Sequence, residues 1–107
     1  MTDCIQVVTT TARKEDAEAI ARSLVEDRLA ACVQVVGPVT STYRWEGKIE
    51  TSQEWQVWAK TRRTLYDRVE QAIRRLHPYD VPEILAVPVV AGSESYLAWL
   101  AEEVKEA

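Results

Sequence analysis

The sequence is poor in the residues from which compact ligand-binding motifs are built. Its 107 residues include three glycines, two cysteines, one histidine and no phenylalanine. The glycines stand at least ten positions apart, which excludes a phosphate-binding P-loop and a G-x-G-x-x-G dinucleotide turn. The single histidine excludes a multi-histidine zinc site within one copy of the chain.

Basic charge and long apolar runs are also scarce. Thirteen Lys and Arg side chains against seventeen Asp and Glu give a net charge of −4, so we expect no nucleic-acid partner. The longest apolar run, residues 84–91, is too short to cross a membrane, and no membrane partner is expected. The two cysteines form no C-x-x-C pair, and a domain of this size needs no disulfide. We therefore expect a reduced, cytoplasmic protein.

The residues that are present indicate one soluble domain spanning residues 1–107. Hydrophobic residues make up 47% and charged residues 28% of the chain, the balance of a globular protein. Four tryptophans in so small a domain are the unusual feature. Runs of β-branched residues and apolar residues at helical spacing predict strands at 4–10, 32–45, 49–62 and 84–91, and helices at 14–31, 64–77 and 96–104.

This order predicts an α+β fold of the ferredoxin-like kind, β-α-β-β-α-β with a C-terminal helix added. Its sheet has four antiparallel strands with helices on one face. Pro88 predicts that the fourth strand lies at an edge of the sheet, and Gly37-Pro38 predicts a bulge in the second strand. A capping box at 64–67 is expected to open the second helix, which must end at His77 because Pro78 follows.

The hairpin of the second and third strands is too long for its domain. Thirteen residues in each direction extend roughly 43 Å, against a radius of gyration of about 13 Å for a chain of this length. An exposed apolar ribbon of this kind is normally buried in a partner, so we expect an obligate homo-oligomer. The alternative is that the ribbon curls back over its own sheet. The residues expected in the oligomer interface are Val39, Ser41, Trp55, Val57, Trp58 and, from the terminal helix, Trp99.

Several motifs together resemble the divalent-cation tolerance proteins of the CutA family, over nearly the whole chain. They are Arg28-Leu29-Ala30-Ala31-Cys32-Val33, Ser41-x-Tyr43-x-Trp45-x-Gly47-x-Ile49, Glu54, Lys60-Thr61, His77-Pro78-Tyr79-x-Val81-Pro82-Glu83-Ile84 and Tyr96-Leu97-x-Trp99. The resemblance implies a ferredoxin-like subunit in a tight trimer, similar to PII-type signalling proteins, with clefts between subunits. It also implies a role in tolerance of copper and other divalent ions, with no established enzymatic reaction.

The candidate metal ligands are few. Cys32, His77 and Glu83 are the residues expected to bind copper or another divalent cation, which folding does not require. One subunit offers too few thiolate and imidazole ligands for a closed site, so a metal site needs several copies. Some members of the family carry a cysteine and a second histidine where this chain has Thr9 and Leu76, which removes two ligands from a site of that kind.

Each candidate also has a purely structural interpretation. For Cys32 the structural alternative, which its apolar neighbours favour, is a small buried hydrophobic residue. His77 either caps a helix or lines a cleft. The loop at 77–83 is either a rigid crossover or part of a binding site. A site would combine this loop with Cys32 and with Tyr43, Trp45, Lys60 and Tyr79 in a cleft between subunits.

Catalysis has the least support. Cys32 and His77 form the only thiol–imidazole pair, and an apolar-flanked thiol is a poor nucleophile. The leading hypothesis is a non-enzymatic, homotrimeric metal-tolerance protein. The second hypothesis is a PII-like module whose cleft binds a small anion, a nucleotide or a partner segment, attracted by Lys60. A purely structural trimer is the third.

Overall fold

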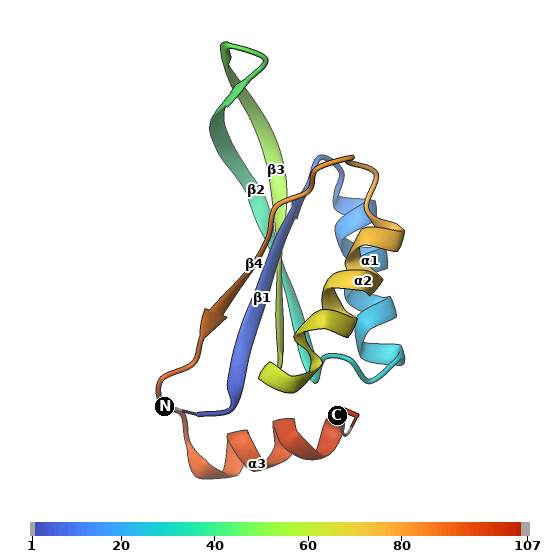
Figure 1. Ribbon diagram of the computed structural model, residues 1–107, viewed down its shortest axis with the longest axis vertical. Coiled ribbons are helices and arrows are strands. Elements are labelled where there is room, and N and C mark those ends of the chain that lie inside the picture. Colours follow the sequence, from blue (N-terminus) through green and yellow to red (C-terminus); the bar gives the residue numbers. More distant parts are fainter. Residues whose placement is uncertain (1, 106–107) are drawn as a thin grey trace.

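The computed structural model describes residues 2–105 and confirms the ferredoxin-like order of elements. A single four-stranded antiparallel sheet has the strand order β2-β3-β1-β4. Its α+β character and its long β2–β3 hairpin agree with the prediction (Figure 1). The elements are β1 (Cys4–Thr11), α1 (Lys14–Glu26), β2 (Cys32–Trp45), β3 (Lys48–Arg62), a 3-10 turn (Arg63–Leu65), α2 (Tyr66–Leu76), β4 (Ile84–Pro88) and α3 (Glu94–Glu103).

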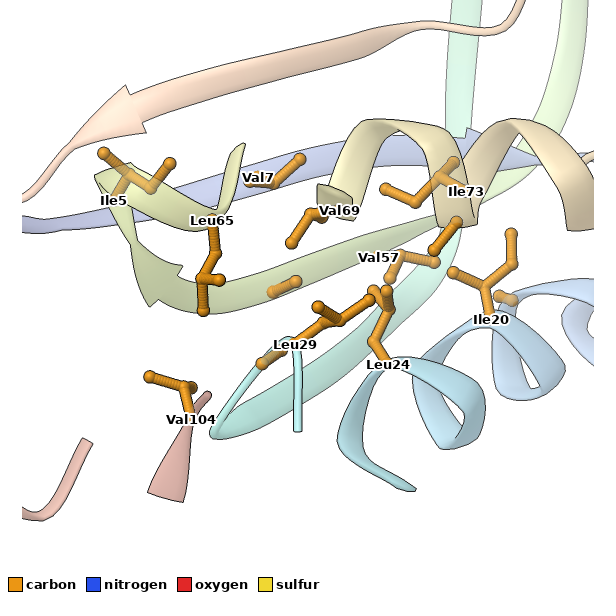
Figure 2. Packing of buried hydrophobic residues seen from close by; sticks show 14 residues of the cluster. Ile5, Val7, Ile20, Leu24, Leu29, Val57, Leu65, Val69, Ile73 and Val104 are labelled. Carbon is orange, nitrogen blue, oxygen red and sulfur yellow. The ribbon is translucent and has the colours of Figure 1, made fainter. Parts of the chain in front are cut away.

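Helices α1 and α2 lie side by side over one face of the sheet and enclose the core (Figure 1). The helices contribute apolar residues at helical spacing, such as Ile20 and Leu24 from α1 and Ile73 from α2, all fully buried. From the sheet, Val7 and Val57 are also fully buried in this cluster (Figure 2). Burying each such side chain away from water stabilises the folded state by about 1.5–3 kcal/mol.

The opposite face of the sheet carries no helix over most of its length. Helix α3 crosses the end of the molecule away from the hairpin (Figure 1). The Arg28 guanidinium holds this helix by donating to the carbonyl oxygens of Glu102 (2.7 Å) and Glu103 (3.0 Å), and Leu100 is buried. We call the uncovered surface the helix-free face.

The β2–β3 hairpin projects beyond the helices and gives the molecule a long axis of 45 Å against 25 and 21 Å for the other two. Glu46 and Gly47 form its two-residue turn with φ angles of 49° and 79°, between the paired residues Trp45 and Lys48. Positive φ at both positions is the geometry whose twist matches two antiparallel strands. The predicted hairpin turn is confirmed.

A bulge in β2 changes which side chains face the helices. Val36 pairs with Gln56 but Val39 pairs with Glu54, so Gly37 and Pro38 together oppose the single residue Trp55. Because side chains alternate along a strand, the odd-numbered residues of β2 change face at this point. Before the bulge they face the helices, and after it they lie on the helix-free face.

Three of the expected boundaries are wrong, each for a local reason. Helix α1 ends at Glu26 and not at residue 31, because Arg28 adopts a φ of 57° and the N–H groups of Leu29 and Ala30 both donate to the Leu24 carbonyl. No capping box opens α2, since a 3-10 turn precedes it and its N-cap residue Leu65 makes no side-chain cap.

The fourth strand ends at Pro88 and not at residue 91. Proline has no N–H to donate to a continuing ladder. Among residues 2–105 the strand pairs with β1 alone, which confirms its edge position. The end of α2 just before His77 is confirmed as well.

Gly37 is needed at the bulge because Trp55 occupies the space beside it. A Cβ atom at this position would lie 2.6 Å from Cδ1 and 2.9 Å from Cγ of Trp55. We expect Gly37→Ala to lower the free energy of unfolding by about 1–3 kcal/mol, the usual cost of overpacking, in urea denaturation at one fixed chain concentration. Gly92→Ala is the matched control, because its Cβ would meet only the flexible end of Leu97 at 3.1 Å. Equal losses in the two variants would contradict the role of the Trp55 contact.

Candidate functional site

The loop after α2 is attached to the end of β1 through His77. Its ring is 8% exposed, and its Nε2 lies 2.7 Å from the Thr10 carbonyl oxygen. A carbonyl only accepts hydrogen bonds, so Nε2 carries the proton and donates. The N–H of Tyr79 donates to Nδ1 at 3.2 Å, and the Tyr79 ring packs against the imidazole with the ring centroids 4.7 Å apart.

These contacts give His77 a structural role. Both ring nitrogens are engaged by backbone groups of the same chain, so neither is free to bind a metal ion. The sequence suggested helix capping or cleft lining for this ring, and its contacts are instead with the end of β1 and with its own loop. Its effect is to hold Tyr79 above the helix-free face beside β3.

Tyr79 in turn reaches a buried carboxylate on β3. Its hydroxyl donates to Oε2 of Glu54 at 3.1 Å, and Glu54 is 8% exposed. Burial is the main cause that raises the pKa of Tyr79 to about 12, and the hydrogen bond to Glu54 is the next. Both causes act because ionisation would put a phenolate in a partly buried site beside a carboxylate.

A cavity of about 800 Å³ surrounds this pair, between the outer part of the hairpin and the loop at 77–83. Tyr43, Trp45 and Tyr79 supply aromatic rings to its lining. The other residues that line it are Thr10, Ser41, Thr42, Glu54, Asp80, Val81, Pro82 and Glu83. The bulge makes this arrangement possible, because it turns Tyr43 and Trp45 onto the face of Glu54.

The charge of the cavity is negative. Glu54, Asp80 and Glu83 line it, and no Lys or Arg does. Lys60, which the second hypothesis needed to attract an anion, donates to Oε1 of Gln34 at 2.8 Å and lies outside the lining. Within the part of the chain that the structure describes, an anion or nucleotide in this cavity would therefore meet carboxylates and no cation.

The expected site residues fall into two separate places. Tyr43, Trp45, Tyr79 and Glu83 line the cavity, whereas Cys32 and Lys60 are cross-strand neighbours further along the sheet.

Cys32 and His77 are also far apart within one chain. Lys60, the partner of Cys32, pairs on its other side with Gln6, while His77 contacts Thr10. The four residues from Gln6 to Thr10 span about 13 Å of strand. Among residues 2–105 no group of three His, Cys, Asp or Glu side chains is placed to hold a metal ion. Cys32, His77 and Glu83 thus do not form one metal site in a single chain.

The residues expected in the oligomer interface divide between the two faces of the sheet. Val57 is fully buried in the subunit's own core and Trp55 packs against that core, so the side chain of Val57 offers no surface to a second chain. The expectation was wrong for Val57, because it is a core residue under the helices, whereas Trp55 keeps part of its surface exposed. Trp58, in contrast, lies on the helix-free face in cross-strand register with Val8.

The helix-free face is rich in exposed apolar side chains at both edges. Val36 on β2 is 46% exposed, and Leu85 and Val87 on β4 are 59% and 41% exposed. Trp99 on α3 is 41% exposed and lies next to Tyr96, with a centroid distance of 5.5 Å. Val39 and Ser41 continue this face along the hairpin after the bulge.

Sequence reasoning missed the residue at the centre of the cavity. Strand alternation places Glu54 on the face of β3 that Gln56 and Trp58 share, and the family motif includes it, but neither makes it a site residue. Asp80 counted only as one of the two carboxylates in the loop at 77–83. No sequence signal placed either of them against Tyr43 and Trp45, because that contact depends on the register of the hairpin.

The raised pKa of Tyr79 predicts a specific dependence of stability on alkaline pH. The folded state keeps the phenol proton up to about pH 12, whereas the ordinary value is 10.0. The contribution of Tyr79 is therefore complete below pH 10 and is lost as the pH rises from 10 to about 12. We expect Tyr79→Phe to reduce the fall in the free energy of unfolding over this interval, measured by urea denaturation at a series of pH values. Tyr66 and Tyr96 also have raised pKa values, so part of the fall remains. An unchanged slope in Tyr79→Phe would contradict the assignment.

Comparison with known proteins agrees with the fold and with the motifs. The family model described as CutA1 divalent ion tolerance protein matches residues 5–103. The divalent-cation tolerance protein CutA of Thermus thermophilus is 44% identical over 96 residues, which cover 90% of this chain and 93% of that protein. The chloroplastic protein CutA of Arabidopsis thaliana is 40% identical over 96 residues, and these span only 53% of its length.

Solved structures of similar proteins share the backbone fold over almost the whole chain. The crystal structure of CutA from Xylella fastidiosa superposes with a TM-score of 0.94 at 41% identity, over 97% of this chain and all of that one. Sequence identity and backbone similarity of this extent together show common descent and not only a shared fold. The chain belongs to the family of CutA1 divalent ion tolerance proteins.

Proposed function

We propose that the protein acts as a non-enzymatic homotrimer in the tolerance of divalent cations. Tolerance of these ions is the property that the names of its relatives state. Self-association is the part of the proposal that this chain's own surface supports most directly.

The observation that carries the proposal is the apolar character of the helix-free face. Val36, Leu85 and Val87 on this face are each more than 40% exposed, and so is Trp99 on the neighbouring helix α3. Strands β2 and β4 leave both edges of the sheet open. A soluble monomer rarely exposes several large apolar side chains beside unpaired strand edges. A second and third copy of the chain would cover it, and three is the number that the family resemblance implies.

A charge introduced into this face tests the assembly. We expect the unmodified protein to have three times the chain mass of 12.1 kDa in light scattering coupled to size exclusion. Leu85→Glu is expected to shift the protein to the monomer, because burying an unpaired carboxylate in an interface is costly. Leu85 is 59% exposed in the single chain, so the subunit itself tolerates the change.

Val25→Glu is the matched control. Val25 is 43% exposed on α1, in the helix layer, and its charged variant should keep the assembly. A monomeric unmodified protein, or a trimeric Leu85→Glu variant, would refute the role of this face.

The copper part of the proposal rests on Cys32. Its thiol is unpaired and partly exposed, and thiolates are preferred ligands of Cu(I). The Tyr96 hydroxyl lies beside it, and this proximity, after burial, helps to raise the pKa of Tyr96. One thiol per chain cannot close a copper site, so the proposal requires Cys32 from more than one copy. Glu83 has a free carboxylate among the described residues but lies in the cavity, away from Cys32.

Copper titration separates the candidate ligands. Under reducing, oxygen-free conditions we expect Cys32→Ala to lose Cu(I) binding and Cys4→Ala to retain it, because Cys4 is buried in its subunit. His77→Ala should be less stable, by about 1–3 kcal/mol for the two unpaired backbone groups, and still bind copper. Undiminished binding by Cys32→Ala would exclude this residue as a ligand.

We further propose that no catalysis is involved and that the protein works in the cytoplasm. The thiol and imidazole that a nucleophilic mechanism would need are separated along the sheet. Both cysteines are free, which supports a reducing compartment. None of the helices among residues 2–105 has the length and apolar character to cross a membrane.

A further inference from the structure

The ends of helices α1 and α3 are joined through Arg28, a residue that the proposed function does not use. The backbone of Arg28 forms the left-handed turn after α1. Its side chain contacts the last turn of α3, the helix that crosses the end of the molecule away from the hairpin (Figure 1). We propose that Arg28 is a clasp that holds α3 in place, and that α3 opens from the rest of the fold as a separate unit when this clasp is released. The clasp lies within one chain and does not rest on the proposed function.

The backbone of Arg28 has a conformation for which glycine is the usual choice. Its φ is 57°, and its N–H donates to the Val25 carbonyl at 3.0 Å. The N–H of Leu29 donates to the Leu24 carbonyl at 2.9 Å. These two bonds form the Schellman ending of a helix, in which glycine is favoured because a Cβ atom strains the left-handed residue. An arginine here is unfavourable for α1 by itself, and the compensating contacts are those of its side chain.

Helix α3 lacks the residues that normally stabilise the C-terminus of a helix. Its last turn contains Glu102 and Glu103 and no basic residue, although the last carbonyl groups of a helix carry partial negative charge. The Arg28 guanidinium supplies the missing cation by donating to both of these carbonyl groups. The Arg28 carbonyl also accepts from the N–H of Lys105 at 2.8 Å. Arg28 therefore joins the two helix ends through both its side chain and its backbone.

Little apolar surface holds α3 apart from this clasp. Within α3, all of whose residues the structure describes, Leu100 is the one buried side chain, and Val104 is buried just after the helix ends. A helix of ten residues is unstable in water by itself, so α3 stays helical only while it is docked. A segment with so small a buried surface opens at a lower free energy than the core. The connection at residues 90–93, which is neither helix nor strand, lets α3 move without breaking the sheet.

The clasp also acts on the surroundings of Cys32. Helix α3 carries Tyr96, whose hydroxyl lies beside the Cys32 thiol, and Trp99, whose ring lies next to that of Tyr96. Both rings move with the helix that carries them. Release of Arg28 therefore withdraws the Tyr96 hydroxyl from the thiol, although Arg28 itself contacts neither residue through its side chain.

Hydrogen exchange followed by mass spectrometry tests the clasp on the full chain in its solution assembly. In the unmodified protein we expect the amides of α3 to exchange faster than those of α2. Arg28→Gly should raise the exchange rate of α3 about fivefold or more, because it removes two hydrogen bonds from a charged donor. The same variant should leave α1 as well protected as before or better, since glycine suits the left-handed position. If Arg28 served only to end α1, exchange in α3 would not change.

Arg22→Gln is the matched control, because it removes an arginine from an exposed position on α1, where its partner is Glu26. It should leave exchange in α3 unchanged. Any of four results would overturn the proposal: α3 no faster than α2 in the unmodified protein, no effect of Arg28→Gly on α3, an equal effect on α2, or the same effect from Arg22→Gln. Because the clasp belongs to one chain, the same ratio of α3 rates is expected in the Leu85→Glu background. This comparison keeps the result separate from the test of trimer formation.

Discussion

The arrangement of the candidate site depends on one buried imidazole. His77 joins the carbonyl of Thr10 at the end of β1 to the N–H of Tyr79 in the following loop. Without that bridge one buried carbonyl and one partly buried N–H would lack these partners, at a total cost of about 1–3 kcal/mol. With it, Tyr79 is held where its hydroxyl reaches Glu54 on β3. The loop, the first strand and the third strand are thereby joined around one cavity by three short contacts.

The bulge at Gly37 and Pro38 is the second constraint. It separates the part of β2 that packs in the core from the part that lines the cavity. On one side of it, β2 and β3 turn Val35 and Val57 toward the helices and complete the core. On the other side, β2 turns Tyr43 and Trp45 toward the cavity. A regular strand would have sent these two rings to the opposite face, because the side-chain period is two residues. The hairpin can therefore project without exposing the core.

Much of the fold was predictable because its signals are local. Pro78 ends α2, Gly47 permits the hairpin turn and Pro88 marks an edge strand, and each acts through its own backbone geometry. The errors came from competing local effects. The left-handed Arg28 ended α1 five residues before the apolar spacing stopped, and a 3-10 turn replaced the expected capping box before α2. The site was less predictable, since Glu54 carried no signal beyond its face and its place in the motif.

The sequence by itself determined the order of the elements, the long hairpin and the family to which the chain belongs, because these follow from residue patterns along the chain. Only the tertiary structure decided which residues meet. It placed Cys32 and His77 too far apart to share a metal ion, turned Val57 inward and brought Glu54 beside Tyr79. The physical reason is that strand register and the bulge set contacts between residues 25 or more positions apart, and no short stretch of sequence specifies them.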